Sequence, residues 1–363
     1  MRVPRLLGLV LAFVLVVAAC GDDDADTTEA TTADTAPPTT AEEEVSTLGT
    51  EDDPIQVVFL PSAAADELIA GGELLADTLN ASTGLFFEVA VPTSYAATIE
   101  GMCAAPDSTI GFISSAAYVF GDALCGMEMP LKSDRFGDVV YWTAFAVARD
   151  SDIETLADLE GKTWGVPDVG STSGYMVPLG QLGTAGITVG EITEFGGSHT
   201  ATARGIYTGD VDFATFYYNG FTNADGETVW DRTTVNADIP DEFVDECALN
   251  ADGEIQCGEY FPVDARRAIR EEAPDVIQKV RILTLSAEAG IPNDGLAFPN
   301  AFPDDLQTII FDALFAFQAA DLEGFQTAFD PYSWDGIVEA IDADYDAIRT
   351  MVADSGVNLE ELE

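Results

Sequence analysis

The chain has 363 residues, of which 14 are basic and 65 acidic, so its formal net charge at pH 7 is -51. No Lys or Arg occurs between Arg5 and Lys132, and nucleic acid is not expected as a partner because it needs clustered basic side chains. Such an excess of acidic residues destabilises a folded protein because the charges repel one another, and salt screens this repulsion. The protein therefore either needs salt for full stability or has an acidic surface with no special role.

The N-terminus is typical of an export signal. Arg2 and Arg5 form a short basic region, and residues 6–19 are apolar but too few to remain in a bilayer as a helix. The Val-Ala-Ala-Cys run ending at Cys20 resembles a bacterial lipobox, whose cysteine becomes the lipidated first residue of the mature chain. We expect a lipoprotein signal peptide over 1–19 and a membrane anchor on Cys20 that holds the protein outside the cytoplasm. An ordinary signal peptide with a chance cysteine is the alternative.

Residues 20–53 form a low-complexity segment that is rich in Thr, Ala, Asp and Glu, with two prolines and almost no large apolar side chains. Such a segment cannot bury enough surface to offset the entropy of ordering it. We therefore expect a disordered acidic tether between the lipid and the globular part.

From residue 54 the chain alternates between strand-like and helix-like segments. The predicted strands are 55–60, 85–91, 109–113, 139–147, 161–166 and 211–214. The predicted helices are 66–82, 95–102, 151–159 and 200–207, another helix is capped by Ser114, and the chain from about 303 is mostly helical with apolar clusters at 309–317 and 337–348. The alternation predicts an α/β protein with parallel sheets covered by helices, and the length suffices for two domains.

Four cysteines remain after Cys20, and they allow three pairings. Because an exported chain favours disulfides, we expect the local pairs Cys103–Cys125 and Cys247–Cys257, the second closing a loop with a turn at 250–253. A metal site is the weaker alternative, since no CxxC spacing occurs and the single histidine lies elsewhere.

Residues 170–175, Gly-Ser-Thr-Ser-Gly-Tyr, precede an apolar helical stretch. Ser171, Thr172 and Ser173 offer three hydroxyls beside the unpaired N–H groups of a helix start, which together predict an anion site, whereas capping alone needs fewer hydroxyls. His199 follows two glycines at a strand-to-helix junction, where open α/β sheets bind ligands. It is either structural or a hydrogen-bond donor that adds charge to an oxyanion if protonated.

Five short motifs carry a family resemblance: 93–102 (TSYAATIEGM), 171–175 (STSGY) with Val177-Pro178, 197–199 (GSH), 209–212 (GDVD) and 291–294 (IPND). In their order and spacing they resemble the phosphate/phosphite/phosphonate-binding family of ABC-importer solute receptors over residues 54 to about 355. The resemblance implies ligand-binding roles for Tyr95, Ser171, Thr172, Ser173 and His199, with Tyr141 as a further binding tyrosine. It also implies that Asp294 accepts a hydrogen bond from a protonated ligand oxygen.

The resemblance implies a type II periplasmic-binding fold, with two α/β lobes, a two-strand hinge and the ligand between them. The lobes are expected at 54–147 plus 286–363 and at 148–285. Aminophosphonate receptors of the family carry a glutamate that meets the ligand's ammonium group, whereas residues 215–219 here contain no acid. The expected ligand is therefore phosphite, methylphosphonate or phosphate rather than an aminoalkyl phosphonate. No Arg or Lys lies in the matched motifs, so neutral donors are expected to hold it.

The expected function is capture of a small phosphorus oxyanion by a monomeric lipoprotein, which delivers it to an ABC permease without a cofactor, a metal or catalysis. A receptor that senses or scavenges ligand without transport is one alternative. A hydrolase with Ser171 or Ser173 as nucleophile and His199 as base is another, although no GxSxG motif occurs. A structural surface lipoprotein is a third.

Overall fold

The computed structural model describes residues 47–232, 237–286, 290–355 and 357. The predicted signal peptide, the lipidation site at Cys20 and the tether up to residue 46 lie outside these ranges. Residues 47–53, expected to belong to the tether, are instead folded onto the globular part: the Gly49 amide donates to the Asp53 carbonyl, and the Phe86 amide donates to the Gly49 carbonyl. The globular part therefore includes residue 47.

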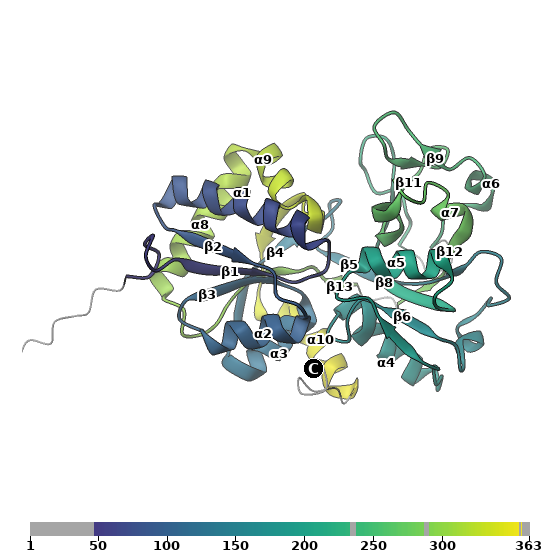
Figure 1. The fold of residues 1–363 in the computed structure, drawn as a ribbon, viewed down its shortest axis with the longest axis horizontal. Helices are drawn as coiled ribbons and strands as arrows, with labels where there is room; N and C mark the ends of the chain where they lie inside the picture. The colour runs from purple at the N-terminus through teal and green to yellow at the C-terminus, as the bar shows by residue number, and fades with distance from the viewer. Residues whose placement is uncertain (1–46, 233–236, 287–289, 356, 358–363) are drawn as a thin grey trace, which may run out of the picture. The chain divides into compact units, whose positions relative to one another are not determined.

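The first lobe is built on a six-stranded sheet in the order β15-β4-β14-β3-β1-β2 (Figure 1). Its strands are β1 (Ile55–Phe59), β2 (Phe87–Ala90), β3 (Thr109–Ile113), β4 (Glu128–Asp134), β14 (Gly295–Phe298) and β15 (Gly336–Glu339). The strands β2 and β3 run parallel to β1, but β14 and β15 return antiparallel to their neighbours. The predicted parallel sheet is therefore correct for the N-terminal strands only.

Helices cover both faces of this sheet because successive side chains of a strand point to opposite sides. The helices of this lobe are α1 (Ala65–Thr83), α2 (Tyr95–Ala104), α3 (Ser115–Cys125), α8 (Asp304–Ala320), α9 (Leu322–Ala328) and α10 (Asp346–Ser355), with single turns η4 (Asp330–Tyr332) and η5 (Asp342–Tyr345). On β1, Val57 and Phe59 pack with α1, α8 and α9, whereas Val58 packs with α2 and α3. In Figure 1 these two groups of helices lie on opposite sides of the sheet.

The second lobe is built on a seven-stranded sheet with the central order β12-β5-β8-β6-β7, to which β11 adds on β8 and β13 on β5. Its strands are β5 (Val140–Ala148), β6 (Trp164–Val166), β7 (Ile192–Glu194), β8 (Phe213–Thr222), β11 (Phe261–Asp264), β12 (Val280–Leu285) and β13 (Ile291–Pro292), with a separate hairpin of β9 (Ala248–Leu249) and β10 (Ile255–Gln256). Its helices are η1 (Leu156–Leu159), η2 (Thr172–Met176), α4 (Val177–Thr184), α5 (His199–Thr208), α6 (Asp241–Val244), η3 (Ala265–Ile269) and α7 (Val276–Lys279).

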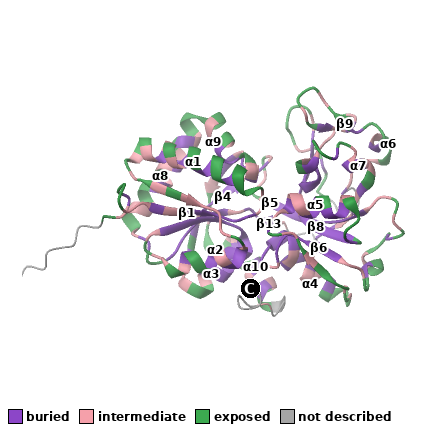
Figure 2. Ribbon diagram, in the orientation of Figure 1, coloured by how far each residue is buried: buried purple, intermediate pink, exposed green. Residues whose placement is uncertain are grey.

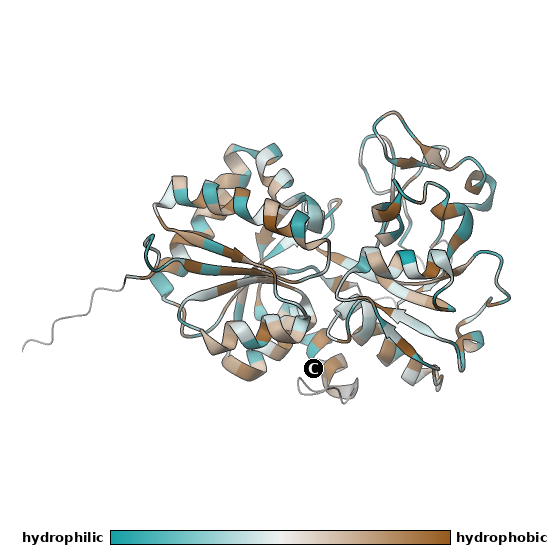
Figure 3. Cartoon of the chain, viewed as in Figure 1, coloured by the Kyte–Doolittle hydropathy of each residue, from teal (hydrophilic) through white to brown (hydrophobic). Residues whose placement is uncertain are grey.

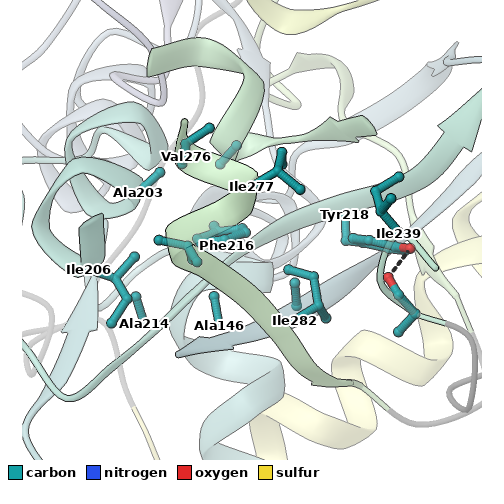
Figure 4. Packing of buried hydrophobic residues seen from close by; sticks show 14 of the residues in the cluster. Ala146, Ala203, Ile206, Ala214, Phe216, Tyr218, Ile239, Val276, Ile277 and Ile282 are labelled. Atoms are coloured by element: carbon teal, nitrogen blue, oxygen red, sulfur yellow. Dashed lines mark hydrogen bonds between the residues drawn. The ribbon is translucent and has the colours of Figure 1, made fainter. Parts of the chain in front are cut away.

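The core of the second lobe lies between the sheet and the helices α5 and α7. Figure 4 shows Phe216 of β8 packed among residues from both helices, and the Tyr218 hydroxyl donating a hydrogen bond to the Ala237 carbonyl at the edge of the cluster. The central strands of both sheets are mostly buried, and apolar residues concentrate on them (Figures 2 and 3). No helix within the described ranges combines the length and the apolar character that a membrane crossing needs.

The chain crosses between the two sheets twice, at 135–139 after β4 and at 293–294 after β13. The first crossing precedes the expected boundary at 147, because β5 pairs along its length with β8 and β12 and so belongs to the second sheet. The Thr143 amide donates to the Ser286 hydroxyl, and the Ser286 amide donates to the Thr143 carbonyl. These bonds join β5 to the residue that follows β12, and the crossing segments themselves are bonded where the Asn293 amide donates to the Val139 carbonyl at 3.1 Å.

Two expected helices are shorter than predicted. In the segment 151–159 only the single turn η1 forms. The apolar cluster at 337–348 begins with the strand β15, which pairs with β4, before the chain becomes helical at η5. An apolar run shows that a segment is buried, but its partner in the sheet decides whether it becomes a strand.

Both predicted disulfides are present. Cys103 of α2 is bonded to Cys125 at the end of α3, and Cys247 is bonded to Cys257 across the β9–β10 hairpin. The turn predicted at 250–253 forms the tip of that hairpin, where Gly253 has a φ of +80°. The second disulfide packs in the core of the second lobe and does not line the cavity described below.

Candidate functional site

A cavity of about 50 Å³ is lined by residues of both lobes and of the hinge. All seven residues that the sequence predicts as ligand contacts line it: Tyr95, Tyr141, Ser171, Thr172, Ser173, His199 and Asp294. The remaining lining residues are Leu60, Ser62, Ser114, Arg135, Tyr217, Asn219, Pro331, Tyr332 and Ser333. Segments far apart in the sequence therefore meet at one place.

Four helices begin at this cavity, two from each lobe. The helices α2 and α3 begin after Ser94 and Ser114, whereas η2 and α5 begin after Ser171 and Ser198. Each of these serine side chains accepts a hydrogen bond from the first turn of its helix. Since the N-terminus of a helix carries partial positive charge, four of them together favour an anion.

The ring of His199 is held in one tautomer. The Tyr217 amide donates to Nδ1 at 3.3 Å, so the proton of the neutral ring lies on Nε2, which is 3.4 Å from the Ser171 hydroxyl. Burial, and secondarily the charge of Arg135, lower the pKa of His199 to about 3. His199 is therefore a neutral donor at physiological pH, and the protonated form considered from the sequence is disfavoured.

The hydroxyls of the 171–173 segment have different partners. Ser171 Oγ accepts from the Gly174 amide at 3.1 Å, which closes the first turn of η2. Thr172 Oγ1 accepts from the Ala116 amide of α3, in the other lobe, at 2.9 Å. Ser173 and Thr172 both lie beside the Tyr141 phenol, whose pKa is raised above its usual value, mainly by burial and secondarily by Asp294. The segment thus serves both as a helix start and as a contact between lobes.

Other contacts also join the lobes around the cavity. The Tyr95 amide donates to Asp168 Oδ2 at 3.3 Å, and the His199 amide donates to the Ser62 carbonyl at 3.2 Å. At Gly170 an added Cβ would lie 2.7 Å from the Tyr95 Cβ, closer than such atoms approach, so the lobes meet here without room for a side chain. The structure is therefore the closed arrangement of the lobes.

An ion pair in the cavity wall escaped the sequence prediction. Arg135, the first residue after β4, donates from Nη2 to Asp294 Oδ2 at 2.6 Å. Neutral donors were expected to hold the ligand, because no matched motif contains a basic residue. One sequence signal was available: Arg135 is one of only 14 basic residues, and it lies where a strand leaves its sheet.

Comparison with known proteins places this geometry in a family. The sequence model described as "ABC transporter, phosphonate, periplasmic substrate-binding protein" matches residues 57–345. The chain belongs to this family. The matched range contains every residue that lines the cavity.

One curated relative of this chain is the phosphate-import protein PhnD of Mycolicibacterium smegmatis. The two sequences are 28% identical over 173 residues. The matched stretch covers 44% of this chain and 54% of that protein, so the chain spans about half the length of its curated relative.

Solved structures show the same fold, the type II periplasmic-binding fold. A binding protein component of an ABC phosphonate transporter from Pseudomonas aeruginosa has a TM-score of 0.60 and 18% identity, and the match covers 84% of this chain and 87% of that one. PhnD1 from Prochlorococcus marinus (MIT 9301), in complex with methylphosphonate, has a TM-score of 0.59 and 13% identity, with 83% and 98% covered. The predicted fold class is therefore confirmed.

The wall formed by β8 corresponds to the segment in which the sequence lacks an acid. Its Tyr217 and Asn219 line the cavity, and Asn219 is buried. Among the described residues that line the cavity, Asp294 is the only carboxylate, and it is already paired with Arg135. A cationic group on a ligand would therefore meet no unpaired negative charge among these residues.

Proposed function

We propose that this protein is an extracytoplasmic solute-binding lipoprotein of an ABC importer. It captures a small phosphorus oxyanion (phosphite, a phosphonate or phosphate) by closure of its lobes and delivers it to a membrane permease. The observation that carries the proposal is the convergence of four helix N-termini, three hydroxyl residues and the neutral His199 on one cavity between the lobes. A ligand that bonds to both lobes favours the closed state, since only that state offers all donors at once.

The size of the cavity supports a small ligand. A water molecule needs about 10–15 Å³ of such volume, so a cavity of about 50 Å³ holds a few water-sized atoms. That is the scale of a tetrahedral oxyanion with at most a small substituent. The aromatic rings of Tyr95, Tyr141 and Tyr217 restrict growth of the ligand further.

The chemistry of the wall supports a ligand without an amino group. An aminoalkyl phosphonate would place an ammonium group near Asn219, which supplies no negative charge. The M. smegmatis relative is named for phosphate import, and the P. marinus structure holds methylphosphonate. Both of these compounds lack an ammonium group, as the proposal requires.

Binding rather than hydrolysis is supported by the surroundings of His199. A base that activates a serine needs a third group to orient it, most often a carboxylate on its far nitrogen. Here that nitrogen accepts from the Tyr217 amide instead. The Ser171 oxygen, in turn, already accepts a backbone N–H in its role as a helix cap.

The anchor is part of the same proposal. The basic start, the short apolar stretch and Cys20 at its end support lipidation, and the Thr-rich segment up to residue 46 supports a spacer to the membrane. Mass spectrometry of the protein from its native membrane tests this part, because a diacylglyceryl group on Cys20 is expected and an unmodified Cys20 would contradict it.

A thermal-shift panel tests the binding function. A binder gains RT ln(1 + [L]/Kd) of stability, so phosphite, methylphosphonate or phosphate should raise the melting temperature, and 2-aminoethylphosphonate should raise it less. In His199→Ala the ligand-induced shift should shrink; it is measured from the variant's own ligand-free melting temperature, which falls because the Tyr217 amide loses its acceptor. No shift with any of these compounds would refute the proposal.

A further inference from the structure

Arg135 is the charged residue of the cavity wall to which the resemblance assigns no role. Its side chain is only 7% exposed, and its guanidinium lies 5.6 Å from the centre of the Tyr141 ring. One of its nitrogens, Nη2, bonds to Asp294 Oδ2. Its Nε is buried and has no hydrogen-bond partner among the described residues.

A buried donor without a partner is costly, because it has lost its water without gaining a hydrogen bond. Guanidinium has five N–H donors in a planar fork that suits oxyanions. Arg135 lines the cavity, so its guanidinium lies within reach of an oxygen of a bound anion.

One network positions both members of the ion pair. Asn293 Nδ2 donates to the Ser133 carbonyl at 3.0 Å and to the Asp138 carbonyl at 2.9 Å, so it ties together the two ends of the turn that carries Arg135. The Ser133 amide donates to the Asp294 carbonyl at 2.9 Å. Arg135 and Asp294 are therefore fixed relative to each other by backbone contacts and do not depend on their own ion pair for position.

We propose that Arg135 contacts the ligand directly, and that the Arg135–Asp294 pair selects a singly protonated oxyanion. The guanidinium donates to a charged oxygen of the ligand, while Asp294 Oδ1, which no described residue bonds, accepts a hydrogen bond from the ligand's hydroxyl, the role that the resemblance implies for Asp294. This inference rests on the proposed function and adds to it the charge form of the ligand that the site selects.

Charge accounts for the selection. Arg135 and Asp294 are the only charged side chains among the described lining residues, and together they are neutral. Without Arg135 an unpaired carboxylate would face an anion. An oxyanion with no hydroxyl, such as sulfate, would present only lone pairs to Asp294 Oδ1, and two acceptors repel each other.

Calorimetric titration at one pH tests the proposal with phosphite, methylphosphonate and sulfate. The wild type should bind the first two and reject sulfate. Arg135→Gln should weaken binding of both by about 30-fold or more, the range for truncating one partner of a buried charge pair. The double variant Arg135→Gln/Asp294→Asn should recover part of the affinity, and Asp294→Asn alone should admit sulfate, because an amide can donate to it.

Lys132→Gln is the matched control. Lys132 lies in β4, three residues before Arg135; its side chain is 11% exposed and is paired with Asp344, but it does not line the cavity. Removal of the Lys132 charge should leave the affinity for phosphite and methylphosphonate unchanged. A loss in Lys132→Gln equal to that in Arg135→Gln would show a general effect of disturbing β4 and would overturn the proposal.

Arg135→Lys decides the matter if Arg135→Gln does not fold. It keeps the charge but loses the planar fork, so about tenfold weaker binding is expected. Wild-type affinity in either Arg135 variant would overturn the proposal. If the wild type binds neither phosphite nor methylphosphonate, nor phosphate in a parallel titration, the proposed function itself fails, and this outcome differs from unchanged affinity in the variants.

Discussion

His199 illustrates how a buried titratable side chain can serve an anion site without carrying a charge. Its Nδ1 is occupied by the Tyr217 amide, which directs the single proton of the ring through Nε2 toward Ser171. Its pKa of about 3 follows first from burial and then from Arg135. At neutral pH the ring is thus a donor of fixed direction.

The lowered pKa of His199 predicts acid sensitivity. The ordinary pKa is 6.5 and the folded value is about 3, so between these values the unfolded chain binds the proton and the folded protein does not. The stability that this group contributes is complete above pH 6.5 and is lost as the pH falls toward 3, by at most about 1.4 kcal/mol per pH unit.

Urea unfolding at pH 7 and pH 5 checks this prediction without ligand. His199→Gln removes the group that must stay neutral, so the wild type should lose more stability between the two pH values than the variant does. An equal loss in both proteins would show that His199 is not buried as a neutral ring.

At the scale of helices and strands, the sequence predicted the parts that are specified locally. The helices predicted at 95–102 and 200–207 and the cap predicted at Ser114 all form, and Ser94 and Ser198 cap the other two helices within one turn. The strand β15 and the ion pair of Arg135 were missed, because their partners lie far away in the chain: β15 pairs with β4, and Arg135 meets Asp294 across 159 residues. Local patterns contain no information about such partners.

The close approach of α2 to the segment before η2 predicts the effect of a single methyl group. In Gly170→Ala the added Cβ would lie 2.7 Å from the Cβ of Tyr95, which cannot rotate away. The closed state should be destabilised, so ligand affinity should fall by about tenfold, whereas each lobe should stay folded.

Gly183→Ala is the control for this prediction, because Gly183 lies in α4 and an added Cβ there meets nothing within 4 Å. Titration calorimetry of both variants provides the measurement. Unchanged affinity in Gly170→Ala would mean that the lobes do not close against each other at this point when ligand binds.

At the scale of the whole molecule, a protein with a net charge of -51 is proposed to bind an anion. The long-range field opposes binding, but salt screens it over about 8–10 Å. The helix N-termini and the hydroxyls act at contact distance in a buried cavity, where they are screened much less. Local dipoles therefore outweigh the distant field, and the Arg135–Asp294 pair adds no net charge.

The acidity also predicts that salt stabilises the fold. Most basic residues of the described ranges already sit in ion pairs, so many carboxylates remain without a cation and repel one another. The melting temperature should rise by several degrees between low salt and 0.5 M NaCl, with KCl giving the same rise. A melting temperature that does not change with salt would indicate that the acidic surface has no such cost.

The most direct test of the central claim is a calorimetric titration of the purified wild-type protein with phosphite, methylphosphonate, phosphate and 2-aminoethylphosphonate. The cavity predicts saturable binding of at least one of the first three, with one ligand per chain, and weaker binding of the aminoethyl compound. No heat of binding with any of the four would contradict an oxyanion site between the lobes, and tightest binding of 2-aminoethylphosphonate would contradict its assignment to ligands without an amino group.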